Sequence, residues 1–278
     1  MLRLGGVAQD WRLTEEQWLS IAPIAVFWVT VGLYEAFDAL QLFADRQLQP
    51  TKEEISRNRV KKVVVFRSII WVHLMQLILG LLSAYYDPWV APRSGSFGTK
   101  AYFNARLGLW ATEYRLGEAM IAQVASIPWG VYLCSRQLAG FIIMDTYIYW
   151  LHVLMHKVPW LYRNIHSRHH QLYTPYALAA QYNHICETLF SDIGAALLST
   201  KLVAMSPRES AIFYALAVVK QVDDHSGYQL LWNPLTWFGL ATGNGPVYHS
   251  VHHQPWGIKV RFFPAKFGNT TLFDTDAE

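Results

Sequence analysis

Charged residues and cysteines are scarce in this sequence. Asp, Glu, Lys and Arg make up 15% of its 278 residues, well below the roughly 25% of an average soluble protein. The two cysteines, Cys134 and Cys186, form no CxxC pair, which argues against a thiolate metal site, a disulfide framework and CxxCH haem attachment. The net charge is only +3, and the basic residues form no stripe interleaved with aromatic ones. Nucleic acid is therefore not an expected partner.

Hydrophobic residues are abundant instead. They make up 53% of the chain, with twelve Trp, fifteen Tyr and fourteen Phe, a composition typical of membrane proteins with aromatic side chains at the interfaces. The polar start of the chain has no basic segment followed directly by an apolar core, so we expect no cleaved signal peptide. The first apolar run would then serve as a retained membrane anchor.

Several apolar runs are long enough to cross a bilayer or to form buried helices. Residues 18–37 and 63–85 each suffice for a hydrocarbon core of roughly 30 Å. Residues 119–151 form a third apolar region, which Arg136 and Gln137 interrupt. This pattern leaves open a hairpin of two partial spans or one long bent pair. A loop is expected at 87–116.

Two further apolar helices are expected at about 188–204 and 210–222, separated by Ser206-Pro207. We predict an all-α integral membrane protein with about four transmembrane helices and a cytosolic helical cap that holds a histidine-rich dimetal site. Residues 1–117 would form the membrane anchor, with two spans and a loop. Residues 118–278 would form the catalytic domain.

Histidines cluster in the second half of the chain. Ten of the eleven lie between positions 152 and 253, and eight form the motifs H-x3-H, H-x2-H-H and H-x2-H-H. Imidazole is a preferred ligand of Zn, Cu, Fe and Ni, and one ion takes about four to six ligands. The cluster therefore predicts two metal ions. The eight histidines are His152, His156, His166, His169, His170, His249, His252 and His253.

Other polar residues near these motifs have candidate roles. His184 and His225 have polar neighbours close to the ends of apolar helices, and we predict both as further ligands. His73 stands alone in the second apolar run and is expected to be a hydrogen-bonded residue. The carboxylates expected to orient ligating imidazoles are Asp145, Glu187, Asp223 and Asp224.

The segments DTYIYWLHVLMH, RNIHSRHHQLYTPYA, VDDHSGY and YHSVHH resemble the fatty acid hydroxylase/sterol desaturase superfamily, and most closely its sphingoid-base C4-hydroxylases of fungi and plants. The resemblance implies that the ten histidines hold two non-haem irons. It also implies residence in the endoplasmic reticulum membrane, use of O2, and electrons from NAD(P)H through a separate cytochrome b5 and its reductase. Ile185 departs from the family pattern, which usually has Pro there.

The expected reaction is hydroxylation at C4 of sphinganine or dihydroceramide, a step in sphingolipid biosynthesis, with a sphingoid base or ceramide lipid as substrate. The alternatives are a sterol or fatty-acyl desaturase or oxidase of the same superfamily, and a non-catalytic metal- or haem-binding membrane protein. Basic residues between the first two apolar runs, such as Arg46, Arg57 and Lys62, favour a cytosolic location for that loop. The histidine half would share this location if an even number of crossings separates the two.

Overall fold

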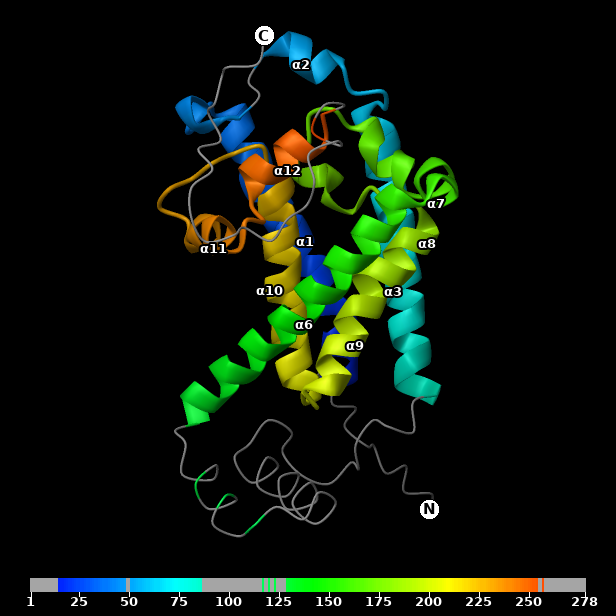
Figure 1. The fold of residues 1–278 in the computed structure, drawn as a ribbon, viewed down its shortest axis with the longest axis vertical. Coiled ribbons are helices and arrows are strands. Elements are labelled where there is room, and N and C mark those ends of the chain that lie inside the picture. Colours follow the sequence, from blue (N-terminus) through cyan, green and yellow to red (C-terminus); the bar gives the residue numbers. More distant parts are fainter. Residues whose placement is uncertain are drawn as a thin grey trace, which may run out of the picture.

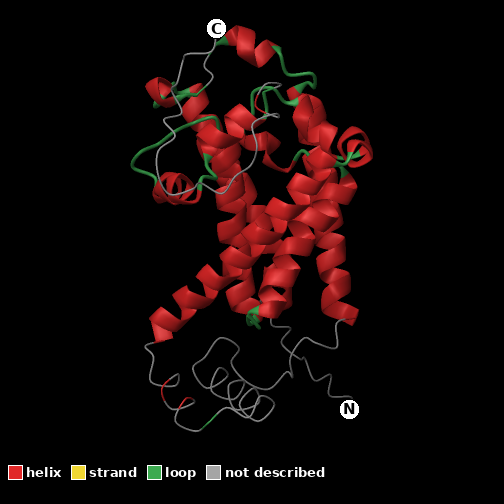
Figure 2. Ribbon diagram, in the orientation of Figure 1, coloured by secondary structure: helices red, strands yellow, loops and turns green. Residues whose placement is uncertain are grey.

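The computed structural model describes residues 15–48, 51–86 and 129–254, together with residues 117, 120, 123 and 257. Within these residues every regular element is a helix (Figure 2), and the sole pairing of β type is an isolated bridge between Gln47 and Tyr228. The prediction of an all-α fold is confirmed. The loop expected at 87–116 lies outside the described residues.

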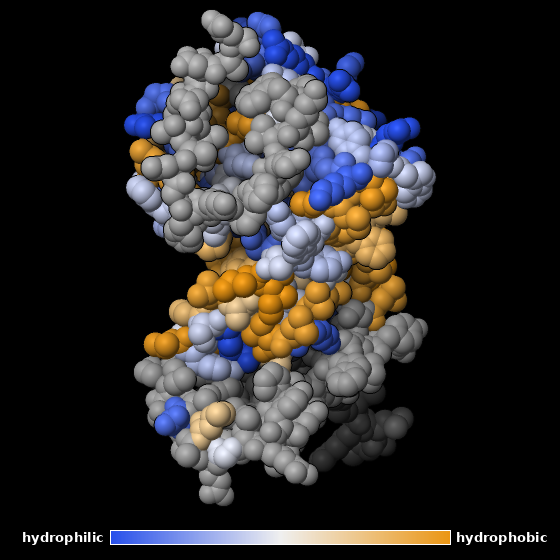
Figure 3. Space-filling view, in the orientation of Figure 1, coloured by the Kyte–Doolittle hydropathy of each residue, from blue (hydrophilic) through white to orange (hydrophobic). Residues whose placement is uncertain are grey.

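Three helices in the described part of the chain are long and apolar enough to cross a membrane. They are α1 (Glu15–Ala39), α3 (Lys62–Tyr86) and α6 (Trp129–Lys157). Large apolar side chains on them face outward, including Val29, which is 75% exposed, and Trp71, which is 72% exposed. Figure 3 shows apolar side chains gathered around the middle of the molecule and polar ones at its upper end. The prediction of membrane-spanning helices is supported by three candidate spans in the described residues, and the predicted number of about four stays a prediction.

The helix α6 is continuous through Arg136 and Gln137, so the described part of the 119–151 region is one span and not a hairpin. Both polar side chains contact Glu209 of the neighbouring helix α10 (Pro207–His225). The Arg136 guanidinium Nε lies 2.8 Å from Oε1 of Glu209, and Gln137 Nε2 donates to the Glu209 carbonyl at 3.1 Å. Because both side chains have polar partners on α10, they interrupt the apolar pattern without ending the helix.

The other helices among the described residues are shorter. The two predicted helices near 188–204 and 210–222 are present, with a turn at Ser206, whose side chain and Glu209 form a capping box. The first of them contains a π-helical turn. The shorter elements are η1 (Ala44–Arg46), α2 (Lys52–Ser56), α7 (Pro159–Asn164), η2 (His166–Gln171), η3 (Ala177–Gln181), α8 (Ile185–Glu187), the π-helix η4 (Thr188–Gly194), α9 (Ala195–Leu202), α10 (Pro207–His225), α11 (Pro234–Thr242) and α12 (Pro246–His252).

The N-terminal spans and the histidine half share one hydrophobic core. The helix α1 packs against α3 and α10, and α6 packs against α9. Phe27 of α1 and Val65 of α3 are fully buried in the same cluster as Leu172 and Val222. In Figure 1, α2 lies at the same end of the molecule as α12. Among the described residues, the chain runs away from that end along α3 and returns along α6, so two described spans lie between the basic loop and the histidines.

Candidate metal centre

Eight histidines meet in two groups at the end of the helical bundle. Within each group, one ring nitrogen of every imidazole lies within 4.8 Å of the others. Each group combines residues from segments far apart in the sequence. The first group is His152, His156, His166 and His252, and the second is His169, His225, His249 and His253.

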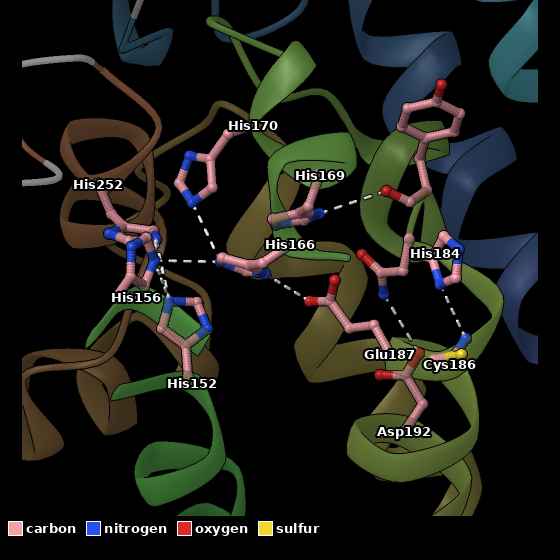
Figure 4. Close-up of polar contacts among 12 residues, drawn as sticks. His152, His156, His166, His169, His170, His184, Cys186, Glu187, Asp192 and His252 are labelled. Carbon is pink, nitrogen blue, oxygen red and sulfur yellow. Dashed lines mark hydrogen bonds and ion pairs between the residues drawn. The ribbon is translucent and has the colours of Figure 1, made fainter. Parts of the chain in front are cut away.

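In the first group the Nε2 atoms converge. His152 and His156 occupy one face of the last turns of α6, because residues four apart on a helix are neighbours. The Nε2 atom of His252 lies 3.0 Å from that of His152 and 3.3 Å from that of His156. His166 closes the group, with its Nε2 atom 3.1 Å from that of His156. Figure 4 shows these rings turned toward one another.

The second group joins the end of α10 to η2 and α12. The Nε2 atoms of His225 and His169 are 3.4 Å apart, and those of His253 and His249 are 2.9 Å apart. The adjacent residues His252 and His253 belong to different groups. This agrees with the sequence-based interpretation that an adjacent pair points two ways and suits two neighbouring metals.

In four of the imidazoles, a hydrogen bond at Nδ1 determines which ring nitrogen can bind a metal ion. Nδ1 of His166 donates to Glu187 Oε1 at 2.8 Å. The Nδ1 atoms of the other three face backbone carbonyl oxygens, which only accept. These pairs are His225 with Gln221 at 2.7 Å, His253 with Leu172 at 2.7 Å, and His169 with Tyr182 at 3.4 Å. A proton on Nδ1 leaves the lone pair of a neutral imidazole on Nε2.

This arrangement fits two metal ions. Nitrogen lone pairs that face one another without a proton between them repel, and a cation among them removes the repulsion. Metal–imidazole bonds are roughly 2.0–2.1 Å long, so ligands of one ion stand roughly 3.0–3.4 Å apart. The Nε2 separations of contacting pairs within the groups run from 2.9 Å to 3.4 Å. The geometry of the donor set therefore matches metal coordination better than hydrogen bonding.

Burial keeps these imidazoles neutral. It lowers the pKa of His166 and His249 well below the usual value, with neighbouring imidazoles adding to the effect. It lowers the pKa of His225 to about 3, and His169 adds to that shift. A neutral imidazole is the form that binds a metal ion, so the site is ready for metal at neutral pH.

Three histidines lie outside the two groups, namely His170 and His184, which were predicted as ligands, and His73, which was not. His170 lies between the groups, with its Nε2 atom 3.1 Å from that of His166 and its ring 5.0 Å from that of His253. His184 belongs to neither group. Its Nδ1 atom accepts a hydrogen bond from the Cys186 amide at 3.2 Å and caps α8.

The isolated His73 is hydrogen-bonded at both ring nitrogens, as expected from its place in an apolar run. Trp28 Nε1 donates to its Nδ1 at 3.1 Å, and its Nε2 lies 3.0 Å from Gln181 Oε1.

One of the four candidate carboxylates touches a ligand ring, and it is Glu187. Asp223 instead accepts hydrogen bonds from Tyr34 and Asn233. Asp224 accepts from Lys220 at 2.5 Å, and Asp145 accepts from Asn244 at 3.3 Å. Asp223 and Asp145 thus join separate segments beside the site, whereas Asp224 pairs with Lys220 of the same helix α10.

The sequence did not predict a cluster of hydrogen-bonded polar side chains that is formed by Asn183, Asp192 and Gln221. Their side chains are hydrogen-bonded to one another, with both amides donating to the carboxylate. Asp192 lies in the π-helix η4, a kind of turn that is frequent at functional sites. No local motif marks these residues, because three separate segments bring them together.

A cavity of about 1210 Å³ leads from the histidines into the bundle. His152 and His225 line its metal end, and Leu19 of α1, Leu79 of α3 and Phe141 of α6 line it farther along. It exceeds the roughly 300–1,000 Å³ of ordinary small-molecule pockets. Its length along three apolar helices suits a long-chain lipid.

Comparison with known proteins agrees with this picture. The model of the family described as fatty acid hydroxylase matches residues 137–276. The sphingolipid C4-hydroxylase of Saccharomyces cerevisiae is 33% identical over 87% of this chain and 66% of its own length. The sphinganine C4-monooxygenase 1 of Arabidopsis thaliana is 32% identical over 87% of this chain and 80% of its own.

A third relative, the very-long-chain aldehyde decarbonylase of Oryza sativa subsp. indica, is 30% identical over 90% of this chain and 84% of its own length. No solved structure matches. The matched region contains all ten predicted ligands and both histidine groups. The chain belongs to the fatty acid hydroxylase family.

Proposed function

We propose that this chain is a membrane hydroxylase that adds a hydroxyl group at C4 of a sphingoid lipid, sphinganine or dihydroceramide. The observation that carries the proposal is the pair of four-histidine groups at the end of an apolar cavity of about 1210 Å³. The names of the relatives from yeast and Arabidopsis support the substrate class.

The two histidine groups would hold two non-haem irons, with His170 placed to interact with either. All-imidazole donor sets with no cysteine suit iron, copper or zinc, and the oxidation of an unactivated C–H bond favours iron. Bound iron would supply the activation of O2 for this oxidation. Electrons would come from NAD(P)H through cytochrome b5 and its reductase as separate proteins.

The chain itself would bind and orient the lipid. The alkyl tail would lie along the apolar wall formed by residues such as Leu19, Leu79 and Phe141, which keeps water from the tail. The polar headgroup would lie at the histidine end. A bound lipid would thereby present one carbon to the histidine groups and exclude water from the site.

The charge of the basic loop and the described spans support a location for the chain. Two described spans lie between the basic loop around η1 and α2 and the histidine groups, so the preference of basic loops for the cytosol supports a cytosolic histidine end. We propose residence in the endoplasmic reticulum membrane, with residues 1–117 as the anchor region and residues 118–278 as the catalytic region.

Expression in cells that lack their own C4-hydroxylase tests the proposal. Mass spectrometry of the long-chain bases should detect a 4-hydroxylated base with the intact chain and none with His169→Ala. Since His169 belongs to the second histidine group, the variant separates activity of this chain from background. Absence of the hydroxylated base with a well-expressed intact chain would defeat the proposal.

The same experiment distinguishes the other reactions. One relative is named as an aldehyde decarbonylase, and the superfamily also contains desaturases. The alternatives to hydroxylation at this site are therefore desaturation, oxidation and decarbonylation. A desaturase or oxidase product would carry a new double bond or carbonyl, and a decarbonylase product would lack one carbon. A purified protein with a Soret band would instead indicate a haem protein.

A further inference from the structure

Asp192 lies deep in the protein, on the wall of the cavity. Its Oδ2 atom accepts a hydrogen bond from Asn183 Nδ2 at 3.3 Å, and its Oδ1 atom accepts one from Gln221 Nε2 at 3.1 Å. The side chain keeps some accessible surface and lines the cavity. The two amides thus hold the carboxylate in place with surface left for a ligand.

No cation of the described chain balances this carboxylate. Its two hydrogen-bond donors are neutral amides, and the charged side chain that acts on it is another acid, Glu187. Burial, reinforced by Glu187, raises the pKa of Asp192 to about 7. Lys220 also lines the cavity, but its ammonium is bound to both carboxylate oxygens of Asp224. A deeply placed carboxylate without a cation is costly, and a cationic ligand would remove that cost.

The wall around Asp192 has more acceptors than donors. The buried Oε2 atom of Glu187 receives no hydrogen bond from any described residue, and the Asn183 side chain interacts with His169. Glu187 and Asn183 both line the cavity. Buried acceptors are rarely left unsatisfied in native proteins. Together with Asp192, Glu187 creates a negative potential at this place, which favours a ligand that is positively charged and rich in N–H donors.

The segments that hold Asp192 also hold two histidines of the second group. The carbonyl of Gln221 accepts from His225 Nδ1 at 2.7 Å. Asn183 directly follows Tyr182, whose carbonyl faces His169 Nδ1 at 3.4 Å. A charged group bound to Asp192 would therefore be held by the same segments that position His225 and His169.

We propose that Asp192 binds the primary ammonium group of a free long-chain base, so that the enzyme prefers sphinganine to its N-acylated form. This inference rests on the proposed function and narrows its substrate. An ammonium group offers three N–H donors and a positive charge, whereas an amide nitrogen offers one donor and no charge. The ammonium of sphinganine is on C2, so its attachment at Asp192 would bring C4, two carbons farther along, to the histidine groups.

Binding of two lipids to the purified full-length protein in nanodiscs tests this. The lipids are sphinganine and N-acetylsphinganine, and the variants are Asp192→Asn, Asp192→Glu and the surface control Asp45→Asn. Loss of one charge-assisted contact should weaken sphinganine binding by about tenfold or more in Asp192→Asn. N-acetylsphinganine binding should change little in that variant. Asp192→Glu should keep the preference for the amine, and Asp45→Asn should match the wild type.

Three outcomes overturn the proposal. The first is an equal loss of binding affinity for both lipids in Asp192→Asn. The second is an unchanged preference for sphinganine in that variant, and the third is tighter binding of N-acetylsphinganine than of sphinganine by the wild type. The third outcome is measured on the wild type, so it tests the proposal even if Asp192→Asn does not fold. Turnover separates this inference from the proposed function. A wild type that hydroxylates N-acylated lipid alone contradicts the inference, whereas one that hydroxylates neither lipid contradicts the function as well.

Discussion

Nδ1 of His166 lies 2.8 Å from Oε1 of Glu187, and both side chains are buried. The carboxylate accepts a hydrogen bond from the Nδ1–H group of His166. The lone pair of this imidazole is then on Nε2, which faces the first histidine group. A carboxylate behind a ligating imidazole also increases its basicity as a ligand. With a metal ion bound to the first histidine group, Glu187 would therefore strengthen its binding by orienting His166.

Glu187→Gln should weaken metal binding or activity by roughly 10–100-fold, the usual effect of losing such a partner. Gln keeps a hydrogen-bond acceptor of similar size but removes the charge. Metal content after dialysis against a series of chelator concentrations measures the effect. Glu53→Gln is the matched control, because Glu53 lies on the exposed helix α2. Equal metal retention by the two variants would contradict the role assigned to Glu187.

His184 and His249 should respond differently to substitution. His249 belongs to the second group, so His249→Ala should lose metal from that group and abolish turnover. His184 caps α8 from outside both groups, so His184→Asn, which preserves a capping side chain, should retain both metals. His184→Ala should cost about 1 kcal/mol of stability through the lost cap. Elemental analysis and thermal unfolding check the three variants, and loss of metal in His184→Asn would place His184 among the ligands.

The sequence was sufficient to predict the long apolar helices and the pairing of His152 with His156 on one helix face. Apolar runs of about twenty residues have one stable form in a bilayer, which explains why α1 and α3 match the predicted spans. The spacing of His152 and His156 places both on one helix face regardless of tertiary structure. Both inferences depend on local geometry alone.

Features that depend on tertiary contact could not be predicted. Arg136 reads as an interruption of a span until Glu209, 73 residues later, is placed beside it. The division of the histidines into two groups needs the orientation of α12 relative to α6. The placement of Asp192 needs Asn183 and Gln221 from other segments. Each of these cases involves a pairing of residues that no sequence spacing encodes.

The buried pair of Arg136 and Glu209 should be important for stability. Their side chains are 15% and 7% exposed, and Arg136 also donates to the Ala204 carbonyl. Arg136→Leu leaves the Glu209 carboxylate buried without its cation, which should destabilise the fold by about 3–5 kcal/mol. The double variant Arg136→Leu/Glu209→Gln should recover part of this loss. Thermal unfolding in detergent measures both, and a single variant as stable as the wild type would contradict the prediction.

Asp192 should make the lipid-free protein less stable as the pH rises. The pKa of Asp192 is raised to about 7 in the folded protein, whereas an unfolded Asp has a pKa of about 3.9. The folded state therefore binds the proton more tightly. The stability that this provides is fully present below about pH 4, is lost as the pH rises toward 7, and does not return at higher pH.

Asp192→Asn removes this dependence, so it should melt at a higher temperature than the wild type at pH 8, with the difference shrinking toward pH 5. Glu187 is the other acid facing Asp192, and it is present in both proteins, so its own titration largely cancels in the difference. Saturating sphinganine should raise the melting temperature of the wild type more than that of Asp192→Asn, because a ligand stabilises the state that binds it more tightly. A variant that melts below the wild type at pH 8 without lipid would show that the carboxylate is needed for folding itself.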